Sequence, residues 1–211
     1  MSFAHCREEP DYKFKNTLSS MNLLSHALLS QSEDDHVFTV NVLWDFIGRD
    51  LRQDRRDFVS RGSKIHRAID RETDCSEEFK QALHLVSDYT ESVSGVVVDI
   101  ALDYALSHDW NHYSPDNRLK LFDRFYDRME KVAPGICERA VSLIASMRER
   151  NWFKSYGELA GIERVFHRLA SRCGNLNSII GAEKEIDRNV DHYLRLMRSL
   201  YPKVGAAVKR L

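Results

Sequence analysis

Residues 94–108, SGVVVDIALDYALSH, decide the fold class of this chain. Eight apolar side chains surround two carboxylates, Asp99 and Asp103, on the helix that this stretch predicts. A helix that is apolar on nearly every face is buried among other elements, whereas a surface helix carries a single apolar stripe. The stretch therefore predicts a buried helix that brings two carboxylates into the protein core.

Further helices are predicted on both sides of this stretch, because only 9 Gly and 4 Pro interrupt the chain. Residues 21–29 and 37–50 are apolar, although VFTVNV (37–42) alternates as a strand would, before LWDFIGRDL restores a helical pattern. Ser63 and Ser76 are suitable N-caps for two more helices, and Pro134 for the first turn of another. The fold class predicted is all-α: a single-domain bundle of about seven to nine helices over residues 21–211, after an irregular N-terminal arm at 1–20.

Composition excludes several classes of protein. The net charge of −1 argues against a nucleic-acid or membrane-surface binder, since both usually need a strongly basic face. The first residues lack the apolar stretch of a signal peptide, and no run is long enough to span a membrane. Four cysteines stand far apart, which suits neither a zinc knuckle nor a disulfide framework: Cys6, Cys75, Cys137 and Cys173. We expect reduced thiols and a cytoplasmic protein.

Pairs of polar residues at i and i+4 are the strongest functional signal. Asp99 and Asp103 share one face of the buried helix. Three more pairs have the same spacing: His66 and Asp70, Asn41 and Asp45, and Asn22 and His26. Imidazole nitrogen and carboxylate oxygen are the ligands of zinc, manganese, iron and magnesium sites, and facing helices of a bundle can hold them. The four pairs together predict a metal site.

Each pair also has a structural explanation. Asp99 and Asp103 can belong to a buried ion-pair network, since an unpaired buried carboxylate is costly. His26 by itself can be a hydrogen-bonded core histidine.

The order of these motifs resembles a known family. MNLLSHALL (21–29), NVLWDF (41–46), IHRAID (65–70) and VVVDIALDYALSHDW (96–110) follow one another as in the acyl carrier protein phosphodiesterases, also called acyl carrier protein hydrolases. The resemblance continues through NWFKSYGELAGIERVFHRLASR (151–172) and LRLMRSLYPKV (194–204), and so covers nearly everything but the arm.

The resemblance implies an all-helical, HD-like phosphohydrolase that uses a divalent metal, manganese first and magnesium or iron as alternatives. Its substrate is holo-acyl carrier protein, from which hydrolysis releases 4′-phosphopantetheine and apo-carrier. Matching positions give the metal ligands His26, Asp45, His66, Asp70 and Asp99. Asp103 is predicted to orient the water or act as general base. Arg67 is predicted to clamp a phosphate oxygen, with pairing to a buried aspartate as the alternative.

The chain also departs from the family pattern. Tyr104 follows Asp103, where a histidine is usual, and Trp44 precedes Asp45, where a small residue is usual. Val40 stands at a common glycine position, and Gly48-Arg49 inverts a basic-then-Gly order. None of these changes removes a predicted ligand, but they concern the mouth of the site and any proton donor.

A basic stretch indicates the partner. Residues 49–71 hold eight basic and four acidic side chains, an excess of four positive charges in a nearly neutral chain. Acyl carrier proteins are strongly acidic, so such a rim would attract them, although a solvated surface with internal ion pairs has the same composition. Two other functions remain open: a small-molecule phosphohydrolase or oxygenase on the same scaffold, and a non-catalytic protein that binds an acidic partner.

Overall fold

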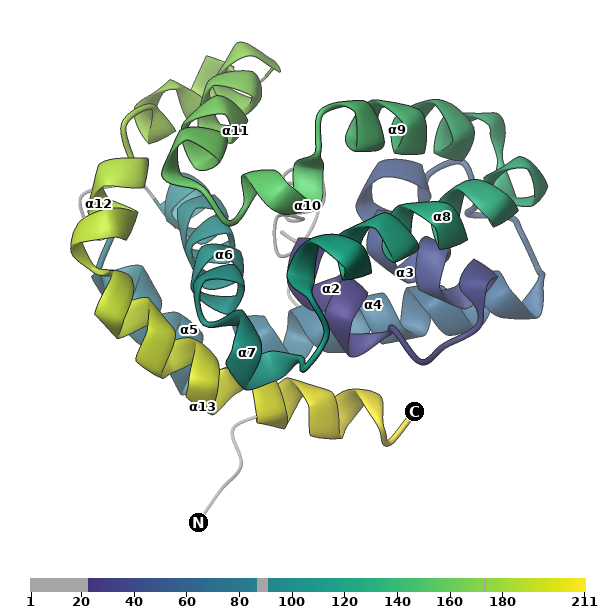
Figure 1. Ribbon diagram of the computed structural model, residues 1–211, viewed down its shortest axis with the longest axis horizontal. Helices are drawn as coiled ribbons and strands as arrows, with labels where there is room; N and C mark the ends of the chain where they lie inside the picture. The colour runs from purple at the N-terminus through teal and green to yellow at the C-terminus, as the bar shows by residue number, and fades with distance from the viewer. Residues whose placement is uncertain (1–22, 87–90, 173) are drawn as a thin grey trace.

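The computed structural model describes residues 23–86, 91–172 and 174–211, so Asn22 and the predicted arm at 1–20 lie outside the described residues. All regular secondary structure in these ranges is helical (Figure 1). The α-helices are α2 (Leu23–Leu29), α3 (Asp35–Ile47), α4 (Asp57–Asp74), α5 (Glu77–His84), α6 (Glu91–His108), α7 (Trp110–Tyr113), α8 (Arg118–Ile136), α9 (Glu138–Glu149), α10 (Trp152–Ser155), α11 (Leu159–Arg172), α12 (Glu183–Arg188) and α13 (Val190–Val208). A 3-10 helix, η1, spans Gly174–Ile179.

The all-α prediction is confirmed, but the number of helices is larger than predicted. Within the described ranges the chain forms 12 α-helices rather than seven to nine. Helices α7, α10 and α12 hold only four to six residues. Segments this short cannot show a helical period, so sequence patterns miss them.

Helix α6 lies inside the fold, as its sequence predicts. Six of its apolar side chains are fully buried: Val97, Val98, Ile100, Ala101, Ala105 and Leu106. Helix α6 packs against α2, α5, α7, α13 and η1 (Figure 1). Apolar side chains on all faces of α6 thus have a partner, which stabilises the helix in the core.

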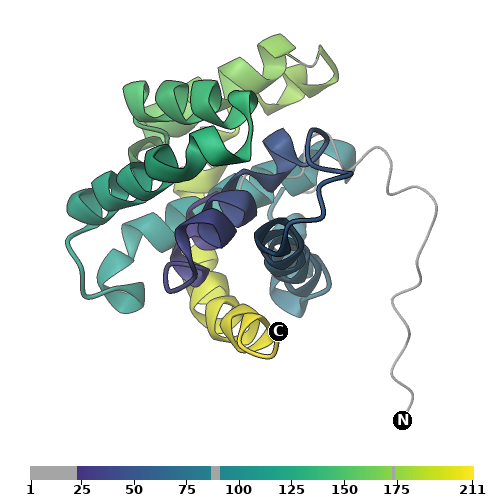
Figure 2. The same cartoon turned by 90° about the vertical axis from the view of Figure 1, so that its right-hand side faces the viewer.

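Helices α3 and α4 form the closest pair near the site. A Cβ atom added at Gly62 would lie 2.7 Å from Val40 Cβ and 2.9 Å from the carbonyl oxygen of Val37. Only glycine therefore permits this approach of α4 to α3. The C-terminal helix α13, drawn in yellow in Figures 1 and 2, packs against another side of α4.

Two predicted helix starts are wrong and one is confirmed. Helix α4 begins at Asp57, and Ser63 lies inside it, where its hydroxyl donates to the carbonyl oxygen of Ser60. Pro134 lies in the last turn of α8, which ends two residues later at Ile136, rather than starting α9; a proline lacks the N–H that would continue the helical hydrogen bonds, which is consistent with the end of the helix here. Ser76 caps α5 as predicted and accepts a hydrogen bond from the Phe79 N–H at 3.0 Å.

Among the described residues, no helix combines the length and the apolar composition that a membrane crossing requires. Cys137 is a free thiol, and Cys6 and Cys173 lie outside the described residues.

Candidate metal centre

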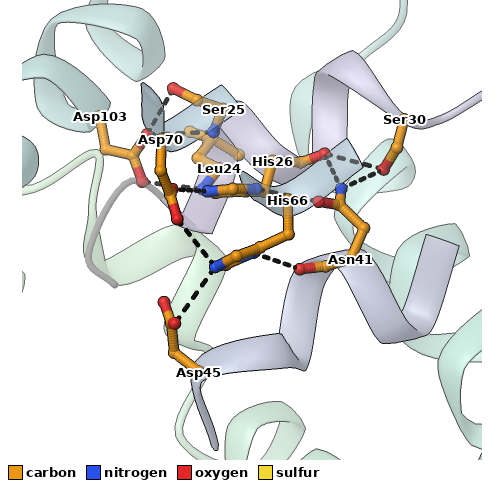
Figure 3. Close-up of polar contacts among 9 residues, drawn as sticks. All are labelled: Leu24, Ser25, His26, Ser30, Asn41, Asp45, His66, Asp70 and Asp103. Atoms are coloured by element: carbon orange, nitrogen blue, oxygen red, sulfur yellow. Dashed lines mark hydrogen bonds and ion pairs between the residues drawn. The ribbon is translucent and has the colours of Figure 1, made fainter. Parts of the chain in front are cut away.

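Three helices bring four of the predicted ligands together. Helix α2 contributes His26, α3 contributes Asp45, and α4 contributes His66 and Asp70. His26 Nε2 lies 3.1 Å from Asp70 Oδ1, and His66 Nε2 lies 3.1 Å from both Asp70 Oδ2 and Asp45 Oδ1 (Figure 3). The two imidazole rings stack with their centres 4.3 Å apart. His26, His66 and Asp70 each offer a ligand atom within 4.8 Å of the others.

The hydrogen bonds of the two histidines leave both Nε2 atoms facing the carboxylates. His66 Nδ1 lies 2.8 Å from the carbonyl oxygen of Asn41, which can only accept, so Nδ1 carries a hydrogen. His26 Nδ1 lies 3.0 Å from Asn41 Oδ1. A neutral ring in either position therefore presents the lone pair of Nε2 to Asp70.

The carboxylates of Asp70 and Asp45 require a positive charge at His66 Nε2. His66 Nε2 and Asp45 Oδ2 are buried and have no hydrogen-bond partner among the described residues, although His66 Nε2 lies within ion-pair distance of two carboxylates. Burial lowers the pKa of His66, but the charges of Asp70 and Asp45 outweigh burial and raise that pKa to about 10. Burial opposes ionisation of Asp70 too, yet His66 and His26 hold the pKa of Asp70 well below its usual range.

A divalent ion suits these donors. Two imidazole nitrogens and a carboxylate on facing helices are a common set of protein ligands for such ions. A metal would replace the proton of His66 and pair with Asp70 and Asp45, which resolves the orphaned atoms. The geometry of these residues therefore fits a divalent metal ion.

Asp99 lies in a different electrostatic environment. Its side chain is buried, and burial together with the charges of Asp74, Asp70, Asp103 and Asp45 raises the pKa of Asp99 well above its usual range. Asp99 does not belong to the group whose ligand atoms lie within 4.8 Å of one another. A carboxyl group surrounded by carboxylates binds either a proton or a cation.

Asp103 contacts the beginning of α2 rather than the histidines. Its carboxylate accepts from the backbone N–H groups of Leu24 (2.7 Å) and Ser25 (3.0 Å) and from the Ser25 hydroxyl (2.8 Å), as Figure 3 shows. Burial raises the pKa of Asp103, and these three hydrogen bonds moderate the shift, which ends at about 7. Because His26 follows Ser25, the carboxylate of Asp103 fixes the helix that carries a predicted ligand.

Arg67 lies on the exposed side of α4, and its neighbour Trp44 is half-buried on α3. The guanidinium carbon of Arg67 lies 5.6 Å from the centre of the Trp44 ring, and its Nη2 donates to Ser63 Oγ. No ion pair of Arg67 occurs among the described residues, so the alternative of a buried aspartate partner finds no support. The Trp44 ring lies over Gly48, where an added Cβ would approach within 2.9 Å of the indole.

Sequence patterns did not assign a role to Asn41. The Asn41/Asp45 spacing marks its position, but its side-chain amide and its backbone carbonyl contact different histidines. A backbone contact leaves no signature in a sequence, and only the packing of α3 between α2 and α4 reveals it.

The basic stretch at 49–71 contains both paired and accessible side chains. Arg56 pairs with Asp54 and donates to the carbonyl oxygens of Gly135 and Ile136 at the end of α8. Arg61 pairs with Glu33. The exposed bases without a close ion pair among the described residues are Arg49, Arg52, Arg55, Lys64 and Arg67.

A second basic surface lies in a cleft of about 670 Å³ beside α10 and α11. Its lining includes Arg150, Arg164 and Arg168. These arginines are spread over 19 residues of sequence, so a local excess of positive charge does not reveal them as a group. The opposite face of α11 belongs to the core, with Ile162 and Phe166 fully buried.

Comparison with known sequences points to one family. A family model described as acyl carrier protein phosphodiesterase matches residues 21–204. Proteins named acyl carrier protein phosphodiesterase from Pectobacterium atrosepticum and Klebsiella pneumoniae subsp. pneumoniae are each 28% identical to the chain, over 190 and 185 residues. These alignments cover 90% and 87% of the chain, and 98% and 95% of the relatives. No solved structure gives a significant match.

Proposed function

The chain belongs to the acyl carrier protein phosphodiesterase family, and on that premise we propose a metal-dependent phosphodiesterase of holo-acyl carrier protein. The reaction is hydrolysis of the bond between 4′-phosphopantetheine and the carrier serine, which yields apo-carrier and 4′-phosphopantetheine. One observation carries the proposal: the Nε2 atoms of His26 and His66 both lie 3.1 Å from the Asp70 carboxylate, inside a helical bundle.

The proposed metal ligands are His26, His66 and Asp70, with Asp45 and Asp99 beside them. Manganese is the first candidate, and magnesium or iron are alternatives, because nitrogen and oxygen donors accommodate all three. The chemistry that a divalent ion supplies is polarisation of a phosphoryl oxygen and a lower pKa for a water beside it.

The protein residues have separate tasks in this proposal. Asp70 keeps its negative charge and balances the cation, because His66 and His26 hold its pKa low. Arg67 is exposed beside the cluster, and its forked donors suit a phosphate oxygen of the substrate. A role of Asp103 at the attacking water stays a prediction. Its three hydrogen bonds to α2 support a positioning role through His26.

The proposed partner surface is the accessible part of the basic stretch. Arg52 and Arg55 are exposed, whereas Arg56 is occupied by Asp54 and the end of α8. An acidic carrier protein would meet these bases in the segment that leads into α4, the helix that also carries Arg67. Docking by charge chiefly raises the rate of association.

The test is release of phosphopantetheine from holo-carrier. Purified protein, stripped with a chelator and reloaded with Mn²⁺, Mg²⁺ or Fe²⁺ in turn, is incubated with holo-acyl carrier protein, and the carrier mass is measured. We expect conversion to apo-carrier only with metal, and none with Asp70→Asn protein. Metal-loaded, folded wild-type protein that leaves the carrier intact would refute the carrier-protein reaction and favour a small-molecule phosphohydrolase. A protein that retains no metal by elemental analysis would favour the non-catalytic binding protein.

A further inference from the structure

Asn41 lies fully buried on α3, between α2 and α4, and contacts both histidines of the cluster. Its side-chain oxygen lies 3.0 Å from His26 Nδ1, and its backbone carbonyl oxygen lies 2.8 Å from His66 Nδ1. Its side-chain nitrogen donates to the carbonyl oxygen of His26 (3.0 Å) and to Ser30 Oγ (2.7 Å).

The orientation of the Asn41 amide follows from these partners. The carbonyl oxygen of His26 can only accept a hydrogen bond. The Ser30 hydroxyl donates its one hydrogen to that same carbonyl oxygen at 2.8 Å, so Ser30 Oγ accepts from Asn41. The amide NH₂ must therefore face these two oxygens, and Oδ1 must face His26 Nδ1.

The orientation of the amide fixes the hydrogen on His26. Asn41 Oδ1 has no hydrogen to donate, so His26 Nδ1 is the donor. The backbone carbonyl of Asn41 imposes the same requirement on His66 Nδ1. One residue thus selects Nε2 as the ligand atom of two rings that stack 4.3 Å apart.

We propose that Asn41 is a positioning residue of the metal centre: it fixes the tautomer and the orientation of His26 and His66 so that both Nε2 atoms face Asp70. This inference rests on the proposed metal-dependent function. Because Asn41 is fully buried, it would act through the two histidines. Partners of this kind restrain ligand rings and keep the ligand nitrogen unprotonated at the metal.

Two substitutions separate this role from simple packing. Asn41→Leu has nearly the same shape but removes both the acceptor for His26 and the two donors. Asn41→Asp keeps an acceptor for His26 Nδ1 and removes the donors. Ser30→Ala is the matched control, because it deletes a partner of the Asn41 amide and leaves the bond to the ring.

The experiment is calorimetric titration of Mn²⁺ into each metal-free protein, with circular dichroism melts to identify folded variants. We expect Asn41→Leu protein to bind metal about 10–100-fold more weakly, which is the usual effect of removing a partner of this kind. Asn41→Asp and Ser30→Ala should stay within about threefold of wild type, since the acceptor remains. A packing role predicts instead that Asn41→Asp and Asn41→Leu lose affinity in proportion to their loss of melting temperature.

A spectroscopic measurement on wild type tests the tautomer without any substitution. In Zn²⁺-loaded protein labelled with ¹⁵N-histidine, we expect the hydrogens of His26 and His66 on Nδ1. A hydrogen on Nε2 of His26, or unchanged affinity in folded Asn41→Leu protein, would overturn the inference while leaving a metal-dependent function intact. Wild-type protein that binds neither Mn²⁺ nor Zn²⁺ would overturn the proposed metal centre itself, and Asn41 as its positioning residue with it.

Discussion

The cluster on α4 and the carboxylates of α6 have the same sequence spacing but opposite electrostatics. On α4, Asp70 lies between two imidazoles, which hold its pKa well below the usual range. On α6, burial and neighbouring acids raise the pKa of Asp99 well above the usual range, and burial raises that of Asp103 to about 7. Burial therefore does not define a metal site by itself. The neighbouring groups decide whether a buried acid keeps the charge that a cation needs.

The largest effect is expected on the α4 side of this comparison. Asp70→Asn removes the charge that both histidines contact, and Asn has only one oxygen to replace two. We expect loss of bound metal and a fall in phosphopantetheine release of more than about 100-fold. Elemental analysis and the carrier mass measure these effects. Full activity with normal metal content in Asp70→Asn protein would place the centre elsewhere.

On the α6 side, loss of stability should exceed loss of metal. Asp103→Asn leaves donors of α2 without a matched acceptor, which should lower the free energy of unfolding by about 1–3 kcal/mol. Asp99→Asn is the control, because a raised pKa means that the metal-free protein already favours an uncharged group there. Urea denaturation of the metal-free proteins measures both. Equal destabilisation by the two variants would contradict the assigned difference between Asp99 and Asp103.

The pH dependence of stability should differ between the two regions. Protonated His66 stabilises the fold. This contribution is complete below the unfolded pKa of 6.5 and is lost as pH rises through the folded pKa of about 10. The lowered pKa of Asp70 reflects the same ion pair at the acid end, where stability is lost as Asp70 becomes protonated. Asp103 has the sign of His66 and the opposite sign to Asp70, but in a lower pH range: because its pKa is raised, stability is lost as pH rises from about 4 through 7.

Melting temperatures of metal-free protein between pH 6.5 and 10 measure the histidine contribution. His66→Gln should flatten the curve over this range, whereas Asp103→Asn should flatten it between about 4 and 7. Exchange of these two signatures would reverse the comparison.

A smaller effect is expected at the accessible bases before α4. Arg52→Glu with Arg55→Glu should raise KM for holo-carrier by about tenfold at low salt, with little change in kcat. Salt should shrink the effect as it screens exposed charges. Arg56 is left unchanged, because it contacts the end of α8. A KM unaffected at low ionic strength would locate docking elsewhere, and the cleft lined by Arg150, Arg164 and Arg168 would be the next surface to mutate.

The smallest effect is expected at Tyr104. The ring of Tyr104 lies 5.5 Å from that of His108, and burial raises its pKa, with the charge of Asp187 adding to the shift. These neighbours belong to α6 and α12 rather than to the histidine cluster. Tyr104→His should therefore change the rate of phosphopantetheine release by less than about threefold. A large gain in rate would mean that position 104 takes part in proton transfer.

The sequence predicted the buried helix and the α4 pair because both depend on local spacing. Spacing alone could not separate Asp99 from Asp103. Residues four apart share a face, but they lie about 6 Å apart along the helix axis. That distance is enough for Asp103 to reach the start of α2 while Asp99 lies among acids. Short helices and the role of the Asn41 carbonyl were missed for a related reason: neither has a side-chain pattern.

The three central ligands lie within one short stretch of chain, from His26 to Asp70, whereas the contact between Ser25 and Asp103 joins residues 78 positions apart. Contacts between near neighbours in sequence form faster than distant ones, because less chain must be ordered to close them. A ribosome also delivers α2, α3 and α4 before α6. The ligands are thus all synthesised before Asp103, whose carboxylate holds the start of α2, so the final position of His26 depends on a helix that is made after every ligand of the cluster.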